Sequence, residues 1–174
     1  YKLKLYNIYM KKKPIHDLKK GEIKVVLNSI QNIFGNNILQ AIDNKSSFKI
    51  SNLDENIDII YVNNTPSFLK LKNNFIPSLK LLVSLKKEEI PRKIVIDMGA
   101  VPFISKGADV MRPGIKEIDS NIEKDGPVII IDEKHGKPIA VGIAMYSFDE
   151  ISSMKEGKVI KTLHYIGDKI WQGL

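Results

Sequence analysis

A helical pattern of apolar residues stands out in the first part of the chain. From Glu22 onward, apolar side chains recur three and four residues apart, which brings them to one face of an α-helix. That face consists of Ile23, Val26, Leu27, Ile30, Ile33 and Phe34. Residues 35–37, Gly-Asn-Asn, follow directly, and glycine and asparagine tolerate the left-handed conformation that ends many helices. The pattern predicts a helix over 22–34 and a second, shorter helix through 38–42.

After these helices the period changes to alternation, which predicts strands. Apolar residues alternate with polar ones, or form a β-branched run, in three short segments at 48–50, 57–62 and 67–71. Residues 63–66, Asn-Asn-Thr-Pro, supply turn chemistry between the last two. Pro77 suits the first turn of a helix that carries leucines up to Leu85. The first half is therefore expected to pack helices on a sheet.

The chain begins with a stretch that fits two structures. Residues 1–9 alternate loosely, then run into three lysines at 11–13 and Pro14. Lysines that end in a proline are typical of a protected sheet edge. The segment therefore fits either an edge strand or a tail.

The second half begins at a charged segment, residues 88–92, which contains a proline at position 91. We place a domain boundary there, giving domains at 1–91 and 92–174. Beyond it, strands are predicted at 93–97, 128–131, 139–146 and 158–163, with helical turns at 98–104 and a short helix that starts at a Ser147–Glu150 capping box and stops at Gly157. Many short strands with brief helices indicate a small, partly closed barrel. The fold class is therefore α+β.

Composition excludes several kinds of chemistry. The 174 residues contain no cysteine and only three histidines, which excludes disulfides, zinc ribbons and cysteine nucleophiles and makes a metal site or other cofactor unexpected. No apolar run approaches a membrane span and the start lacks a signal-peptide core, so the cytoplasm is the expected location. The lysines do not form one face of a clear amphipathic helix, so no membrane partner is expected.

The charge of the chain is distributed unevenly. The formal net charge is +7. Residues 1–91 carry 15 lysines against 8 acidic residues, whereas residues 92–174 carry 12 basic residues against 12 acidic ones. A basic excess points to a polyanionic partner, although solvated lysine-rich faces are common.

One loop in the neutral half, residues 105–115, has an unusual composition. Its glycines permit positive φ or close approach, and Pro113 stiffens its exit. Arg112 is one of only two arginines beside 25 lysines, and its planar fork suits phosphates or base edges. An ordinary tight turn that joins two strands is the other interpretation. Asp109 would repel phosphate, so it either braces the loop or orients Arg112, whereas Val110 and Met111 are expected to pack in the barrel.

The same loop carries a family resemblance. Residues 97–100 (Asp-Met-Gly-Ala) and 107–114 (Gly-Ala-Asp-Val-Met-Arg-Pro-Gly) resemble the signature of the PUA domain. Residues 161–171 look like the C-terminus of the archaeal relatives of the malignant T-cell amplified sequence protein, and residues 75–82 are similar to the last helix of the pre-PUA domain that precedes PUA in that branch. The resemblance spans nearly the whole chain and implies a pre-PUA domain followed by a PUA domain.

The resemblance also implies a function. PUA domains grip structured RNA, often the acceptor end of tRNA, and the eukaryotic relatives act in translation initiation and ribosome recycling with a partner protein. The resemblance implies a non-catalytic, monomeric RNA-binding protein. Its expected RNA partners are tRNA or ribosomal RNA, and its other expected partner is the ribosome or a translation factor. The implied contact residues are Lys106, Gly107, Ala108, Asp109, Arg112, Pro113 and Gly114, with Lys161 on the final strand.

Two other function classes remain open from the sequence. An RNA-modification enzyme, or an accessory subunit of one, would draw on His164, Tyr165 and Asp168, but their spacing does not define a nucleophile with its base, and no GxSxG or phosphate-binding motif is present. A protein-interaction adaptor on the ribosome would use the first half. RNA binding is the function that the sequence favours.

Overall fold

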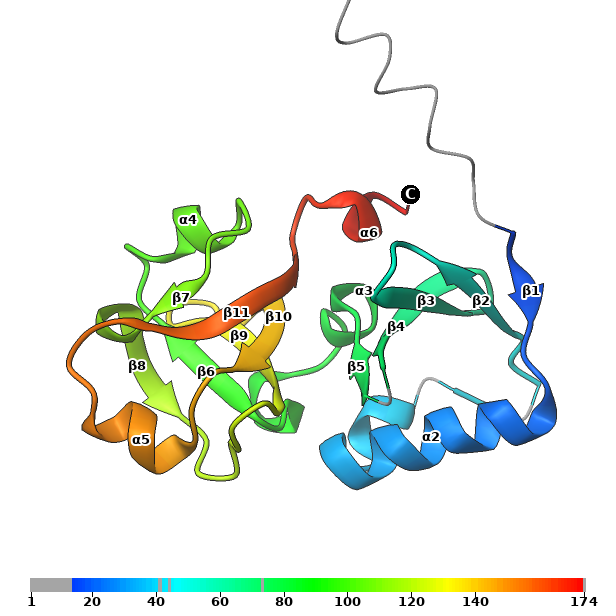
Figure 1. The fold of residues 1–174 in the computed structure, drawn as a ribbon, viewed down its shortest axis with the longest axis horizontal. Helices are drawn as coiled ribbons and strands as arrows, with labels where there is room; N and C mark the ends of the chain where they lie inside the picture. Colours follow the sequence, from blue (N-terminus) through cyan, green and yellow to red (C-terminus); the bar gives the residue numbers. More distant parts are fainter. Residues whose placement is uncertain (1–13, 41, 44, 73, 174) are drawn as a thin grey trace, which may run out of the picture.

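Two β-sheets lie side by side in the protein, one built from each half of the chain (Figure 1). The computed structural model describes residues 14–173 except 41, 44 and 73. The predicted edge strand or tail at 1–9 and the lysines at 11–13 lie outside the described residues. The mixed α+β class expected from the sequence is confirmed.

The first long helix forms where the apolar pattern predicts it. Helix α2 spans Lys20–Phe34 and buries Val26, Ile30 and Phe34. A Glu22 oxygen accepts the Lys19 amide at 2.8 Å, which satisfies one of the free N–H groups that every helix start leaves. Gly35 ends the helix with φ at 78°. The second predicted helix is reduced to a single 3₁₀ turn, η1 (Asn37–Leu39).

The first sheet has five antiparallel strands in sequence order. They are β1 (His16–Asp17), β2 (Phe48–Asn52), β3 (Ile57–Val62), β4 (Thr65–Leu71) and β5 (Asn74–Pro77). The turn predicted at 63–66 was too long. The turn consists of Asn63 and Asn64, both at positive φ, so Thr65 and Pro66 belong to β4.

Pro77 ends a strand rather than starting a helix. Pro77 is the last residue of β5 and pairs with Phe68. The Ser78 hydroxyl then donates to the Pro66 carbonyl at 2.6 Å, and the short helix α3 (Leu79–Leu82) begins only after it. Proline fits β5 because this strand is the last of its sheet, where a missing donor costs little.

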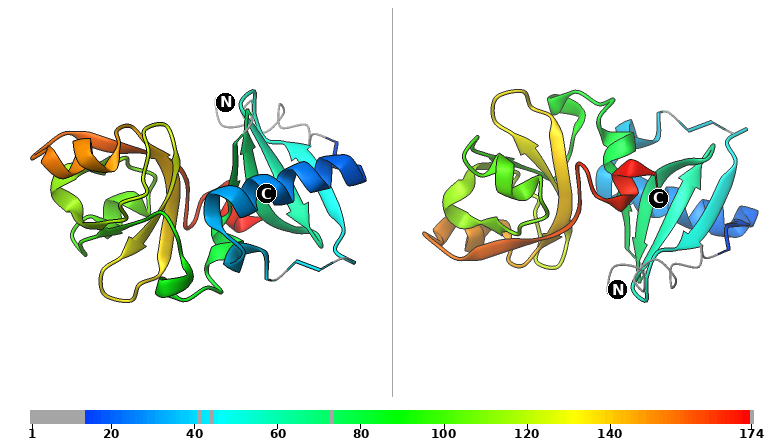
Figure 2. Two further views of the ribbon diagram at one scale, coloured as in Figure 1. Left: turned by 90° about the horizontal axis from the view of Figure 1, so that it is seen from below. Right: turned by 90° about the horizontal axis from the view of Figure 1, so that it is seen from above.

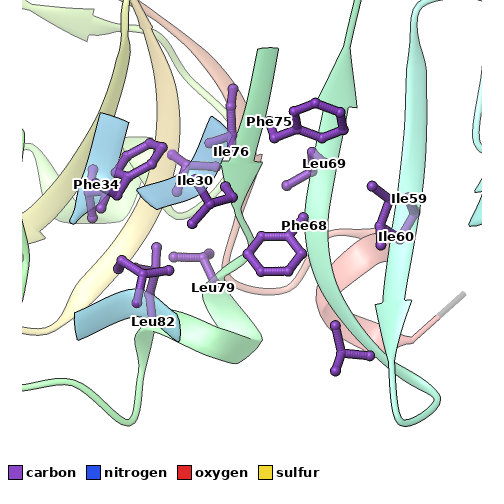
Figure 3. Packing of buried hydrophobic residues seen from close by; sticks show 14 of the residues in the cluster. Ile30, Phe34, Ile59, Ile60, Phe68, Leu69, Phe75, Ile76, Leu79 and Leu82 are labelled. Carbon is purple, nitrogen blue, oxygen red and sulfur yellow. The ribbon is translucent and has the colours of Figure 1, made fainter. Parts of the chain in front are cut away.

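Helices α2 and α3 cover one face of this sheet and form the first core. Figure 3 shows Ile30 and Phe34 of α2 packing toward Ile76 of β5, with Leu79 and Leu82 of α3 beside them. The cluster is almost free of polar atoms, so burial of apolar area stabilises this half.

The second sheet is a curled, half-barrel sheet of six strands. Its strands are β6 (Lys93–Ile96), β7 (Val110–Met111), β8 (Ile115–Ile118), β9 (Pro127–Asp132), β10 (Pro138–Ala144) and β11 (Lys158–Tyr165), in the order β7-β11-β10-β9-β6-β8. Strands β6 and β9 are parallel and the other pairs are antiparallel. No strand range was predicted for β7 or β8, although one of the two interpretations of the loop was a tight turn that joins two strands.

Short helices fill the connections of the second half. Helix α4 (Val101–Ile104) lies where helical turns were expected, and α6 (Lys169–Gln172) follows the last strand. The 3₁₀ turn η2 (Lys87–Glu89) precedes the predicted domain boundary. Helix α5 (Phe148–Ser153) starts at the predicted capping box, where the Ser147 amide donates to Glu150 at 2.8 Å. It ends four residues before Gly157, the predicted stop.

The central strands of the second sheet are buried on both faces. Ile94 and Ile130 point into the barrel core, whereas Val95, Ile129 and Ile131 belong to the core of the first half. Successive strand residues point to opposite faces, so an unbroken apolar run covers both. The two halves therefore share an apolar interface.

The C-terminal helix completes this interface. Figures 1 and 2 place α6, drawn in red, beside the first sheet. Ile170 is only 3% exposed and belongs to the first core, and the Lys80 ammonium lies 4.6 Å from the centre of the Trp171 ring. The end of the chain thus ties the second half back onto the first.

Candidate functional site

The loop singled out by the sequence bridges the two edges of the second sheet. Strands β7 and β8 lie at opposite edges of the sheet, yet only the 3₁₀ turn η3 (Arg112–Gly114) separates them along the chain. Helix α4 and residues 105–109 precede β7 along the chain, and Figure 1 shows α4 above β7, on the side of the second half opposite α5. The turn η3 therefore joins the two edges of the curled sheet.

The two glycines of the loop are required by contacts within the protein. Gly107 has φ of +90°, and a Cβ there would lie 2.6 Å from Cε1 of the Tyr165 ring. A Cβ on Gly114 would lie 3.1 Å from the Ala100 Cβ. The glycines thus set the path of the loop, and the close approach that they permit is to other parts of the chain.

Asp109 braces the loop against the last strand. Its Oδ1 accepts the Thr162 amide at 2.9 Å and its Oδ2 lies 2.8 Å from the Lys158 ammonium. The Thr162 hydroxyl also donates to the Ala108 carbonyl at 2.8 Å. Of the two roles considered for Asp109, the geometry corresponds to bracing.

These contacts change the acidity of Asp109. Partial burial raises the pKa of its carboxyl, but the hydrogen bonds from Lys158 and from the Thr162 amide outweigh burial and hold the pKa below its usual value. The charge of Lys161 lowers the pKa further, which places Lys161 close to the loop. Asp109 is therefore a paired carboxylate at neutral pH, and its negative charge is offset by neighbouring lysines.

Arg112 also makes internal contacts. Its Nε donates to the Ile151 carbonyl of α5 at 2.7 Å, and its Nη1 to the Ile115 carbonyl at 3.4 Å. The side chain is half-buried. A guanidinium has five N–H groups, so these two bonds leave others available. Arg112 thus ties the loop to α5, a role that the amino-acid composition of the loop did not indicate.

The two predicted lysines present their charge to solvent. Lys106 and Lys161 are exposed, and neither takes part in the ion pairs found within the described part of the chain. Pro113 is exposed as well. The structure therefore joins Ala108 and Asp109 to the strand that carries Lys161, whereas Arg112 reaches toward α5, and Lys106 and Lys161 are the exposed cations of the predicted set.

Sequence reasoning missed part of the surface around this loop. Phe103 of α4 is 67% exposed and Met111 is 49% exposed. Met111 was expected to pack in the barrel, and this was wrong, because in the two-residue strand β7 only Val110 points inward. The sequence signal for Phe103 is weak, since a four-residue helix is too short to show which face is buried.

The residues of the enzyme alternative support the fold. His164 is fully buried, with Nδ1 2.7 Å from Asp168 Oδ2. Asp168 also accepts the Tyr165 and Trp171 amides at 3.0 and 2.8 Å, and so caps α6. Burial raises the pKa of Asp168, but the hydrogen bonds from His164 and the Trp171 amide outweigh it and lower the pKa. An imidazole without exposure cannot reach a substrate in this conformation.

Two further features concern possible cofactors and membranes. In residues 14–173, leaving aside the three positions not described, no group of three or more His, Cys, Asp or Glu side chains could hold a metal ion. No helix among the described residues is long and apolar enough to cross a membrane.

Comparison with known proteins identifies the second half. The family model of the PUA domain matches residues 92–166, which contain the loop, its bracing strand β11 and α4. The structure resembles the crystal structure of a hypothetical protein from Pyrococcus horikoshii, with a TM-score of 0.83, 34% identity, and coverage of 91% of this chain and 98% of that chain.

Curated relatives match over both halves. An uncharacterized protein of Methanocaldococcus jannaschii is 40% identical over 88% of this chain and 93% of its own length. Malignant T-cell-amplified sequence 1 of Danio rerio is 30% identical over 88% of each chain, and translation machinery-associated protein 20 of Saccharomyces cerevisiae is 29% identical over 76% of this chain and 75% of its own. The chain therefore belongs to the family of PUA-domain proteins that includes Malignant T-cell-amplified sequence 1.

Proposed function

We propose that the protein is a non-catalytic RNA-binding protein that serves translation, and that its loop contacts structured RNA such as the acceptor end of tRNA. The observation that carries this proposal is the family match over the loop, residues 92–166, together with two open lysines there. The name of the yeast relative, a translation machinery-associated protein, supports a role on the ribosome in initiation or recycling.

The geometry of the loop suits RNA better than a reaction. The base edges of an RNA duplex lie in a deep, narrow groove, so proteins bind its phosphates, hydroxyls and unpaired ends. Exposed Lys106 and Lys161 offer charge for phosphates, while the N–H groups that Arg112 does not use internally are available for a further contact. Bracing by Asp109 and the glycines keeps these groups in place, which lowers the entropy cost of binding.

The basic first half contributes general attraction under this proposal. Residues 1–13 carry five lysines and no acidic residue, whereas residues 14–91 carry ten lysines against eight acidic residues. Most of the excess charge thus precedes the described residues. Each phosphate neutralised adds about −0.9 to the slope of log affinity against log salt on a duplex and about −0.7 on a single strand. Lysine changes in 1–13 should therefore flatten the salt dependence.

The same proposal covers organisation and location. We assign a pre-PUA domain to 1–91 and a PUA domain to 92–174, acting together as a monomer in the cytoplasm, where translation takes place. The shared apolar interface and α6 support a fixed arrangement of the two domains, which would hold the lysines of the first half at a set distance from the loop.

Binding of tRNA to paired lysine variants tests the proposal. Lys106→Ala with Lys161→Ala should weaken binding of unmodified tRNA about tenfold or more, because each lost phosphate contact removes favourable charge pairing. Lys134→Ala, an exposed lysine of the same domain on the β9–β10 hairpin, is the matched control and should change affinity little. Equal effects of the loop variant and the control would contradict the assignment of the loop.

A protein-interaction adaptor is the second candidate, favoured by a groove in the first half. The groove holds about 790 Å³ between α2 and the first sheet, and Val25, 57% exposed, lines it with Leu18 and Phe75. Grooves whose walls combine apolar and polar side chains, as here with Glu22 and Lys70, can accept partner side chains. Retention of a protein partner after nuclease treatment, and its loss in Val25→Asp, would favour this role beside or instead of RNA binding.

A further inference from the structure

The end of strand β11 touches the candidate loop and leads directly to the first half of the molecule. Tyr165 is the last residue of β11, and its ring lies against the loop, since a Cβ on Gly107 would be 2.6 Å from the ring Cε1 and 3.2 Å from the hydroxyl oxygen. Farther along, in α6, Ile170 is 3% exposed and belongs to the core of the first half. The segment from Tyr165 to Ile170 therefore joins the loop to the other half.

One carboxylate holds this segment together. Asp168 Oδ2 accepts the Tyr165 amide at 3.0 Å and lies 2.7 Å from Nδ1 of the buried His164. Its Oδ1 accepts the Trp171 amide at 2.8 Å, and the Asp168 amide donates to the Tyr165 carbonyl at 3.2 Å. The backbone of Tyr165 and the first turn of α6 are thus fixed to the same side chain, so a displacement of α6 also removes support from Tyr165.

Helix α6 has a small contact with the first half. It spans four residues, and it contributes Ile170 and the half-buried Trp171 to the first core. The Trp171 ring is also 4.6 Å from the Lys80 ammonium. Local opening takes the least free energy near chain ends with few buried apolar contacts. Docked and released α6 are therefore two states whose populations a bound ligand shifts if it favours one of them.

We propose that Tyr165 is a positioning residue through which docking of α6 on the first half holds the loop in the shape that binds RNA. When α6 is docked, Asp168 fixes Tyr165 and its ring supports the loop backbone at Gly107. When α6 is released, that support is lost. This inference rests on the proposed RNA binding and concerns the regulation of the same site. Coupling between two sites is reciprocal, so RNA bound at the loop also favours docked α6.

Truncation of Ile170 tests the coupling from a position that RNA does not reach, because this side chain is buried. Ile170→Ala should bind tRNA about 5-fold more weakly or worse, the lower end of usual coupling between sites, and Ile170→Val should show a smaller loss. Fluorescence anisotropy of labelled tRNA measures the affinity, at a temperature where circular dichroism shows the variants folded. Val26→Ala, which trims the same core from α2, is the matched control for lost stability and should keep wild-type affinity.

Trp171 reports the reverse direction of the coupling. It is the only tryptophan of the chain and belongs to α6, so quenching of its fluorescence by acrylamide measures how far α6 is docked. Saturating tRNA should lower this quenching in the wild type and in Tyr165→Phe, which keeps the ring. Tyr165→Ala should still bind tRNA through the lysines, but its quenching should not change when tRNA is added.

The outcomes separate this inference from the proposed function. Wild-type affinity in Ile170→Ala, an equal loss in Val26→Ala, or quenching that still falls with tRNA in Tyr165→Ala overturns the coupling and leaves RNA binding by the loop intact. If Tyr165→Ala does not fold, the Ile170 variants and their control decide alone. Wild-type protein that does not bind tRNA overturns the proposed function and, with it, the role of Tyr165.

Discussion

Removal of the Arg112 side chain should lower the stability of the fold. In Arg112→Ala, the α5 carbonyl of Ile151 loses a charged donor at 2.7 Å, and the Ile115 carbonyl loses one at 3.4 Å. A hydrogen bond to a charged group contributes about 1.5–3 kcal/mol, and the longer bond adds little. The Ile151 carbonyl also accepts the Met154 amide at 3.3 Å, so it is not left without a partner.

These terms give an expected loss of about 2 kcal/mol in the free energy of unfolding. For a chain of this length that corresponds to a decrease of about 4–8 °C in Tm. Urea denaturation followed by circular dichroism measures the first quantity directly. Lys106→Ala, an exposed neighbour with no internal ion pair among the described residues, is the control and should stay within about 0.5 kcal/mol of the wild type.

Arg112→Lys separates geometry from charge. A lysine keeps the positive charge but has no N–H at the Nε position, so its stability should stay close to that of Arg112→Ala. Stability of Arg112→Ala within about 0.5 kcal/mol of the wild type would refute the internal role of this arginine. If RNA affinity then fell as well, Arg112 would be a contact residue alone.

Three further changes test other parts of the structure. Gly107→Ala should destabilise the protein by about 1–3 kcal/mol in urea, because alanine is strained at φ +90° and its Cβ would meet the Tyr165 ring; unchanged stability would mean that the loop takes another path. Asp109 has a lowered pKa when folded, so the stability it adds should be full above its unfolded pKa of about 3.9 and lost as pH falls through the lower folded value. Acid titration of stability should therefore be shallower in Asp109→Asn, and an identical curve would argue against the Lys158 pair. Ile170→Ala should cost about 2–5 kcal/mol, measured by urea denaturation, whereas a cost below about 0.5 kcal/mol would show that α6 does not stabilise the shared core.

The sequence predicted those elements whose apolar period was long and complete. Helix α2 has a full stripe from Ile23 to Phe34 and a glycine stop, so both its type and its end were clear. The run at 128–131 was predicted to be a strand. The sequence did not predict what packs against its second face, because an unbroken apolar run does not indicate what covers each side. Only the fold shows that Ile129 and Ile131 pack against the other half.

Short elements escaped prediction because their structure depends on distant partners. Strand β7 has two residues and exists only through its pairing with β11, and Pro77 fits a helix start or a strand end equally well until Phe68 is placed beside it.

The sequence drew attention to the loop at 105–115, but it did not predict the internal contacts that the loop residues make. Composition made Arg112 the leading contact, since an isolated arginine suits phosphate, yet the structure uses part of its fork for carbonyls of the protein. Phe103 was overlooked, because exposure of a side chain in a single helical turn depends on how α4 lies on the barrel. Spacing identifies which residues share a loop; only tertiary packing decides which of them face outward.

Changes in the NMR chemical shifts of backbone amides during titration with tRNA test most directly whether the loop binds RNA. If it does, the shifts induced at low ratios of tRNA should gather at residues 103–114 and at Lys161, and should vanish in the variant that combines Lys106→Ala with Lys161→Ala. Shifts confined to the groove between α2 and the first sheet, or no shifts at all with tRNA in excess, would contradict RNA binding by the loop.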